Sequence, residues 1–253
     1  MCVALIWTAV QIACSDPAPP PHALLPGQSN SITALPRSAP PQKTEPQPTQ
    51  PIGPEGFVDK FDRPELGPDW LNTGAPYRIE QGHLAYILAH NHPLWLNRIL
   101  PRDLQVEFDC ASGSPDGDIK VELFGDGHTF ESDEDVQKDV QYTATGYVFI
   151  LGGWKNRLST LVKQREHAWQ QDKTVPRNTE FHIQPGRPYH FTITRINSKT
   201  AAHFDWKLDN QEFLSWDDPQ PLDGPGHDRF AFEGWESPIA CANLKITPLP
   251  ARP

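Results

Sequence analysis

The stretch HFDWKLDNQEFLSW, residues 203–216, decides the fold of this protein. Apolar and polar residues alternate in both of its arms, and the tetrad Leu208-Asp209-Asn210-Gln211 lies between them. A period of two is typical of a β-strand with one buried face, and Asp and Asn favour tight turns. The stretch therefore predicts a β-hairpin.

Runs with the same period recur on both sides of this hairpin. They lie at residues 77–80, 83–88, 94–100, 104–109, 118–125, 147–151, 158–164, 189–196, 229–235 and 242–249. Gly, Pro, Asn or Asp separates each run from the next, as expected for strands joined by turns, and no long run has a helical period. The sequence thus predicts one all-β domain over residues 56–250, a two-sheet antiparallel jelly-roll sandwich.

The segment before this domain has a different composition. Residues 15–55 contain twelve prolines, interleaved with Ser, Thr and Gln and with almost no aromatic residues. Such a segment cannot bury enough apolar surface to offset the entropy lost on ordering, and repeated proline favours extended chain. We therefore expect a disordered tether that acts as a spacer. A disordered tail without a spacer role is the alternative.

Residues 1–14 have the features of an export signal. Residues 3–13 form an apolar run too short to span a bilayer, and Ile12-Ala13-Cys14 follows the pattern of a cleavage site. This ending resembles the lipobox of bacterial lipoproteins, which implies lipidation of Cys14 and anchoring in the bacterial cell envelope. Gln11 departs from the pattern, and no Lys or Arg precedes Arg37. An ordinary secretory leader, cleaved elsewhere, is the alternative.

Removal of the leader and lipidation of Cys14 leave two thiols, Cys110 and Cys241. Both lie in strand-like runs, and export places them in an oxidising compartment. They either pair in a disulfide or remain buried and unpaired.

Charge argues against nucleic acid as a partner. The formal net charge is −10, the pI is about 5.4, and no stripe of Lys and Arg offers sites for phosphates. The acidic run at residues 131–135 is expected to be a solvated loop. No P-loop or dinucleotide fingerprint predicts a cofactor. Calcium is an alternative, with Asp116, Asp118 and Asp126 as ligands, although no calcium-loop pattern is met.

Several segments resemble a known superfamily. The opening FVDKFDRPELGPDW, the middle YVFILGGWKN, the hairpin WKLDNQEFLSW and the closing CANLKITPL are similar to the concanavalin A-like lectins and glucanases, in particular their laminin-G-like and keto-disaccharide-hydrolase-like jelly rolls. The resemblance implies a jelly roll and a carbohydrate partner. Since the superfamily contains lectins, hydrolases, lyases and adhesion modules, it leaves the activity open.

Three charges on alternate positions of one strand are candidate site residues: Asp118, Lys120 and Glu122. Alternate residues of a strand share one face, so these side chains are expected together outside the core. A retaining glycosidase needs two carboxyl groups about 5 Å apart, a spacing that residues two apart on a strand can approach. Glu122 with Asp118 is therefore a candidate acid/base pair. A charge ladder that only solvates the sheet is the alternative.

The resemblance weighs against hydrolysis by this pair. Glucanases of the superfamily place two glutamates around an aspartate on alternate strand positions, whereas Lys120 holds the middle position here. His167, two residues from Arg165, is a second candidate partner for Glu122.

Aromatic side chains suggest a sugar-binding groove. Trp95, Trp154 and Trp235 could stack on sugar rings while polar side chains bind the hydroxyl groups. The candidate polar side chains are Lys120, Glu122, Asn156, Arg165, His167 and Glu233. Packing of each tryptophan in the core is the alternative.

Three functions remain in competition at this point. The first is an envelope-tethered module that binds carbohydrate without cleaving it, which the incomplete glucanase motif favours. The second is a glycan hydrolase or lyase that uses Glu122 with Asp118 or His167. The third is a structural or adhesion module that binds another protein.

Overall fold

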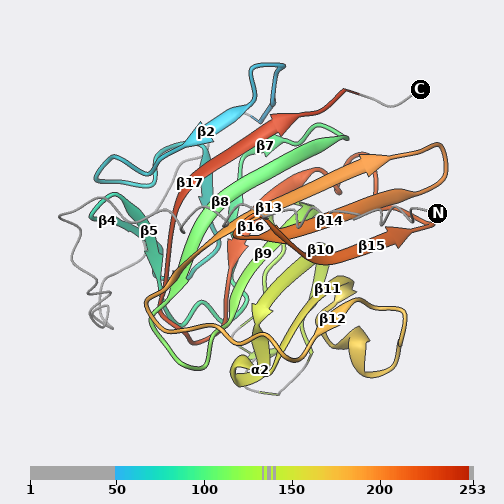
Figure 1. Cartoon of the computed structure of the whole chain (residues 1–253). Helices are drawn as coiled ribbons and strands as arrows, with labels where there is room; N and C mark the ends of the chain where they lie inside the picture. The colour runs from blue at the N-terminus through green and yellow to red at the C-terminus, as the bar shows by residue number, and fades with distance from the viewer. Residues whose placement is uncertain (1–48, 133, 136–137, 139–140, 251–253) are drawn as a thin grey trace, which may run out of the picture.

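A computed structural model of the chain describes residues 49–132, 134, 135, 138 and 141–250. Two antiparallel sheets pack against each other around one aromatic-rich core (Figure 1). The predicted all-β sandwich is confirmed. The leader, Cys14 and the tether up to residue 48 lie outside the described residues.

One sheet has seven strands. In spatial order they are β12 (Arg177–Asn178), β11 (Leu158–Arg165), β10 (Thr143–Gly152), β9 (Ile119–Gly125), β16 (Arg229–Glu233), β6 (Leu94–Leu96) and β3 (Trp70–Asn72). This sheet positions the candidate site.

The other sheet has eight strands. Their order is β15 (Gln211–Asp218), β14 (Ala202–Leu208), β13 (Pro188–Asn197), β8 (Leu104–Ser112), β17 (Ile239–Pro248), β5 (His83–Tyr86) and β4 (Arg78–Glu80), with β2 (Phe57–Asp59) also paired to β17.

The predicted hairpin is confirmed. Strands β14 and β15 pair through Leu208 and Gln211, and the two residues between them, Asp209 and Asn210, have φ values of 51° and 63°. Two adjacent left-handed residues form the type of turn that matches the twist of a two-stranded hairpin, and Asp and Asn tolerate that conformation.

Strand pairing begins before residue 56, within the segment predicted to be a tether. Strand β1 (Gln50–Pro51) pairs in parallel with β7 (Arg98–Ile99), so residues assigned to the tether already belong to the fold. The run at residues 94–100 is also two short strands rather than one, because β6 and β7 belong to different sheets. Short edge pairings of this kind leave no periodic pattern in the sequence.

Short helical segments lie on both sides of β11: α2 (Gly153–Asn156) before it and a 3₁₀ turn, η1 (Glu166–Gln170), after it. Among the described residues, no helix is both long and apolar enough to cross a membrane.

The core lies between the sheets and is dense in aromatic rings. Phe108 and Phe191, on neighbouring strands, stack with ring centroids 4.6 Å apart. From β9, Ile119, Val121 and Leu123 enter this core. Because successive side chains of a strand point to opposite faces, Lys120 and Glu122 lie on the other side of the seven-stranded sheet, which we call the outer face.

A disulfide joins Cys110 of β8 to Cys241 of β17. The two residues are directly opposite in the pairing of the strands, with Cα atoms 4.1 Å apart. The bond connects an early strand to the last one across 131 residues of chain.

Candidate functional site

The outer face of the seven-stranded sheet carries the charged side chains. Lys120 lies opposite Ile150 of β10 on one side and Glu233 of β16 on the other. Residues opposite each other on neighbouring strands share a face. A buried lysine therefore lies beside a buried glutamate on this face of the sheet.

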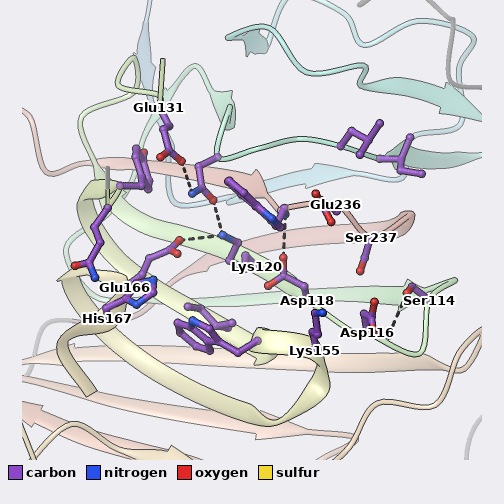
Figure 2. A pocket seen from close by; sticks show the side chains of 18 of the residues that line it. Ser114, Asp116, Asp118, Lys120, Glu131, Lys155, Glu166, His167, Glu236 and Ser237 are labelled. Atoms are coloured by element: carbon purple, nitrogen blue, oxygen red, sulfur yellow. Dashed lines mark hydrogen bonds and ion pairs between the residues drawn. The ribbon is translucent and has the colours of Figure 1, made fainter. Parts of the chain in front are cut away.

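A cleft of about 930 Å³ opens on this face. Its walls come from the segments around β9, α2, η1 and the loop after β16 (Figure 2). The lining side chains that matter for the argument below are Asn91, Asp116, Asp118, Lys120, Glu131, Tyr142, Trp154, Lys155, Glu166, His167, Trp235 and Glu236.

A hydrogen-bonded network crosses the floor of the cleft. Lys120 Nζ donates to Glu166 Oε1 at 2.9 Å and to Asn91 Oδ1 at 2.5 Å. Asn91 Nδ2 in turn donates to Glu131 Oε2 at 2.8 Å. Figure 2 draws the bonds of this network as dashed lines near Lys120, Glu166 and Glu131. A buried charge is tolerated when it is paired and hydrogen-bonded, and Lys120 meets both conditions.

Lys120 stays charged in this setting. Only 3% of its side chain is exposed, and burial by itself would lower its pKa. The carboxylates of Glu166, Asp118 and Glu233 outweigh that effect and raise the pKa of Lys120 above its ordinary value.

Asp118 joins two walls of the cleft. Its carboxylate accepts a hydrogen bond from the backbone N–H of Trp235 at 2.9 Å, and its own N–H donates to the carbonyl of Gly152 at 2.9 Å. Gly117 precedes it with φ 75°, and a Cβ there would lie 2.4 Å from the Gly152 oxygen. Burial raises the pKa of Asp118, and nearby Lys120 works in the opposite direction.

The α2 segment has an unusual backbone. Trp154, Lys155 and Asn156 are all left-handed, with φ values of 51°, 62° and 58°. This conformation costs about 1–2 kcal/mol for each residue that is not glycine. Asn156 holds the turn in place, since its side chain donates to the carbonyl of Ile183 and accepts from the N–H of Ile183, both at 2.8 Å.

Two half-buried tryptophans line the cleft. Trp154 packs edge-on against His167 and Trp169, with ring centroids 5.3 and 5.1 Å away. Trp235 packs against His90 at 4.9 Å. Of the sequence candidates, Asp118, Lys120, His167 and these two tryptophans therefore come together in one cleft.

Glu122, the principal catalytic candidate from the sequence, does not line the cleft. Its side chain is fully buried, and Oε1 accepts hydrogen bonds from the N–H groups of Thr145 and Gly146 at 2.9 and 2.5 Å. Burial raises its pKa to about 7. Glu122 shares a face with Lys120, as the alternation predicted, but later segments of the chain cover it.

Trp95, Arg165 and Asn156 lie outside the cleft wall as well. Trp95 is fully buried, and its ring N–H donates to the carbonyl of Thr129 at 3.0 Å. Arg165 is exposed but is not part of the cleft wall. Asn156 acts on the backbone of Ile183, as described above, and is not part of the cleft wall either.

Glu131, the first residue of the acidic run, is not solvated. Glu131 is only 5% exposed and accepts from Asn91 at the cleft. The aspartates considered for calcium do not converge: Asp126 accepts from the N–H groups of His128 and Thr129. Among the described residues, no group of three or more His, Cys, Asp and Glu side chains is arranged to hold a metal ion.

Sequence reasoning missed Tyr142 altogether and gave Glu233 only a minor place. The Tyr142 hydroxyl and both carboxyl oxygens of Glu233 are buried without a hydrogen-bond partner among the described residues. Burial raises the pKa of Glu233 well above its ordinary value; Lys120 opposes this effect, while Glu166 adds to it. No spacing in the sequence marks Tyr142, since it precedes β10 in an irregular segment.

Comparison with known proteins supports the fold. No protein-family model and no curated protein matches the chain. The exoplasmic/lumenal domain of VIP36, solved with Ca²⁺ and Man3GlcNAc, has 12% identity and a TM-score of 0.52, covering 74% of this chain and 86% of that one. The carbohydrate binding module CBM66 from Bacillus subtilis has 14% identity and a TM-score of 0.49, covering 71% and 95%.

The alginate lyase Aly36B has 11% identity and a TM-score of 0.42, covering 70% of this chain and 85% of that one. At 12% identity, the likeness to VIP36 shows the fold and not the function. The likeness to VIP36 supports the two-sheet jelly-roll fold that the sequence predicted.

Proposed function

We propose that this protein binds glycans in the cleft on the outer face of the seven-stranded sheet. The observation that carries the proposal is the pair of half-buried tryptophans, Trp154 and Trp235, in one cleft with carboxylate side chains. Indole rings stack on the apolar faces of sugars, while carboxylates accept hydrogen bonds from sugar hydroxyl groups. The VIP36-like fold supports the proposal as an analogy.

A glycan array with the full chain tests this proposal. We expect Trp235→Ala to weaken binding of any hit about tenfold, the equivalent of about 1.4 kcal/mol of lost stacking and burial. Trp216→Ala is the matched control, because Trp216 is also half-buried but lies on β15 of the other sheet. A silent array, or equal losses in both variants, would leave a protein-binding adhesion module as the better account.

Cleavage of the bound glycan is the second candidate function, and Asp118 is the observation in its favour. Asp118 lines the cleft, and burial raises its pKa, the property required of a general acid. Glu166 or His167 would then act as the base; Glu122 does not line the cleft. Product analysis after incubation with an array hit separates the two functions. Asp118→Asn should abolish turnover in an enzyme and only weaken affinity in a binding module.

We further propose that the chain is exported and anchored by a lipid at Cys14. The leader and its Ile12-Ala13-Cys14 ending support this, and so does the Cys110–Cys241 disulfide, because such bonds persist in oxidising compartments. Expression of the full chain in bacteria with a labelled fatty acid should label the wild type but not Cys14→Ser. Equal labelling of both would refute the assignment.

A further inference from the structure

The charge of the cleft restricts which glycans it can hold. Five carboxylates line it, against two lysines, so the formal charge of the wall is −3. The carboxylates are Asp116, Asp118, Glu131, Glu166 and Glu236, and the lysines are Lys120 and Lys155. An anionic sugar would therefore meet net repulsion, and a cationic one net attraction.

Lys120 offers little to an anionic ligand. It is almost fully buried and already donates to Glu166 and Asn91. Glu166 and Glu131 each commit one carboxyl oxygen to this network, and within the described part of the chain the other oxygen of each makes no hydrogen bond. Unused acceptors thus outnumber available cations. Of the two lysines that line the cleft, Lys155 is the one that an anionic ligand could reach, because it is exposed on the α2 turn.

A second, independent observation indicates a polar ligand. Tyr142 lines the cleft, is 8% exposed, and its hydroxyl has no partner among the described residues. Leaving a buried hydroxyl unpaired costs about 1–3 kcal/mol. A ligand group that hydrogen-bonds to this hydroxyl inside the cleft would offset part of that cost.

We propose that this cleft selects glycans that carry protonated amino groups, such as glucosamine residues without an acetyl group. This proposal rests on the glycan-binding function proposed above. The carboxylates of Asp118, Glu166 and Glu236 surround the ammonium group. The Tyr142 oxygen accepts a hydrogen bond from the ligand, and the faces of Trp154 and Trp235 add cation–π attraction.

Titration calorimetry on the full chain with three probes tests the proposal. The probes are a glucosamine oligomer, the N-acetylglucosamine oligomer of the same length, and a uronic acid oligomer, in a mildly acidic buffer that keeps the amines charged. We expect the glucosamine oligomer to bind at least about tenfold more tightly than its acetylated counterpart, with a preference that shrinks as salt is added. The uronate should bind most weakly.

Three variants assign the effect to this cleft. Glu236→Gln changes an exposed side chain, so it should fold normally and weaken only the charged probe, by about threefold to tenfold. Lys155→Gln should strengthen glucosamine binding, because it removes an opposing charge. Tyr142→Phe should weaken binding several-fold while thermal stability stays equal or rises, since an unpaired buried hydroxyl is lost.

The outcomes separate this inference from the function on which it rests. Equal affinity for the charged and acetylated oligomers would overturn the selectivity and leave glycan binding intact. Tighter binding of the uronate, lost in Lys155→Gln, would also overturn it and would assign an anionic ligand to Lys155. If no glycan of any charge binds, glycan binding and selectivity both fail.

Discussion

Burial decides the protonation of Glu122. The carboxyl group is fully enclosed, and its pKa rises from 4.5 to about 7. Hydrogen bonds from Gly146 and Thr145 oppose this rise but do not cancel it. A carboxyl group that takes up a proton near neutral pH makes the stability of the protein depend on pH, independently of any ligand.

We expect Glu122→Gln to flatten that dependence. Because the pKa in the folded state is above that in the unfolded state, the contribution of Glu122 is complete below about pH 4.5 and is lost as the pH rises through about 7. Loss of this contribution lowers the free energy of unfolding by about 3 kcal/mol. Glutamine stays neutral at every pH. Urea unfolding should therefore show the variant becoming more stable relative to wild type as the pH rises from about 4.5 to about 7.

Glu107→Gln is the control for this measurement. Burial would raise the pKa of Glu107, but its hydrogen bond to Lys245 and other partners lower it. The stability from Glu107 is therefore present above its unfolded pKa and is lost as the pH falls, the opposite sign to Glu122. Two parallel curves for Glu122→Gln and wild type would contradict the assignment.

At the scale of elements, the left-handed α2 turn is the least ordinary part of the fold. It places Trp154 at the cleft and is held by the side chain of Asn156 against the backbone of Ile183. Strained conformations persist where the surroundings over-determine them, and they concentrate at functional sites.

We predict that Asn156→Ala destabilises the domain by about 2–3 kcal/mol. The change removes two hydrogen bonds to Ile183 and leaves alanine in a left-handed conformation that asparagine tolerates better. It should also weaken glycan binding, because Trp154 would no longer be held in place. Thermal unfolding measures the first effect and titration calorimetry the second.

Asn178→Ala provides the comparison for Asn156→Ala. Its side chain also accepts from backbone N–H groups, those of Glu180 and Phe181, but it lies outside the cleft wall. Asn178→Ala should lower the free energy of unfolding without changing the affinity for glycan. Equal binding by both variants would argue against a positioning role for Asn156.

At the scale of the whole molecule, the disulfide connects the early strand β8 to the last strand, β17, in the centre of the eight-stranded sheet. Pairing across 131 residues removes a large loop entropy from the unfolded chain, by about 5 kcal/mol in the chain-entropy model. The bond therefore matters for the entire domain rather than for one strand pair.

Replacing both cysteines, Cys110→Ala with Cys241→Ala, should lower the free energy of unfolding by about 2–5 kcal/mol. Guanidinium unfolding of the double variant, beside oxidised and reduced wild type, measures this. Reduced wild type should approach the variant. An unchanged midpoint in all three samples would mean that the bond adds no stability.

The sequence by itself determined the all-β fold and the β14–β15 hairpin. Alternation with a period of two assigns each side chain to a face of a sheet, and local turn chemistry closes the hairpin at Asp209 and Asn210. The same alternation predicted that Lys120 and Glu122 lie on one face of the sheet, outside the core.

Only the tertiary structure decided which of those residues a ligand can reach. Glu122 and Trp95 are covered by segments that follow β9. Asn91 and Glu166 come from separate parts of the chain to meet Lys120, and Glu131 joins them through Asn91. Such contacts depend on the path of irregular loops, which carry no periodic signal in the sequence. Exposure is a property of the whole packed chain, because a local pattern specifies the face of a strand but not what covers it.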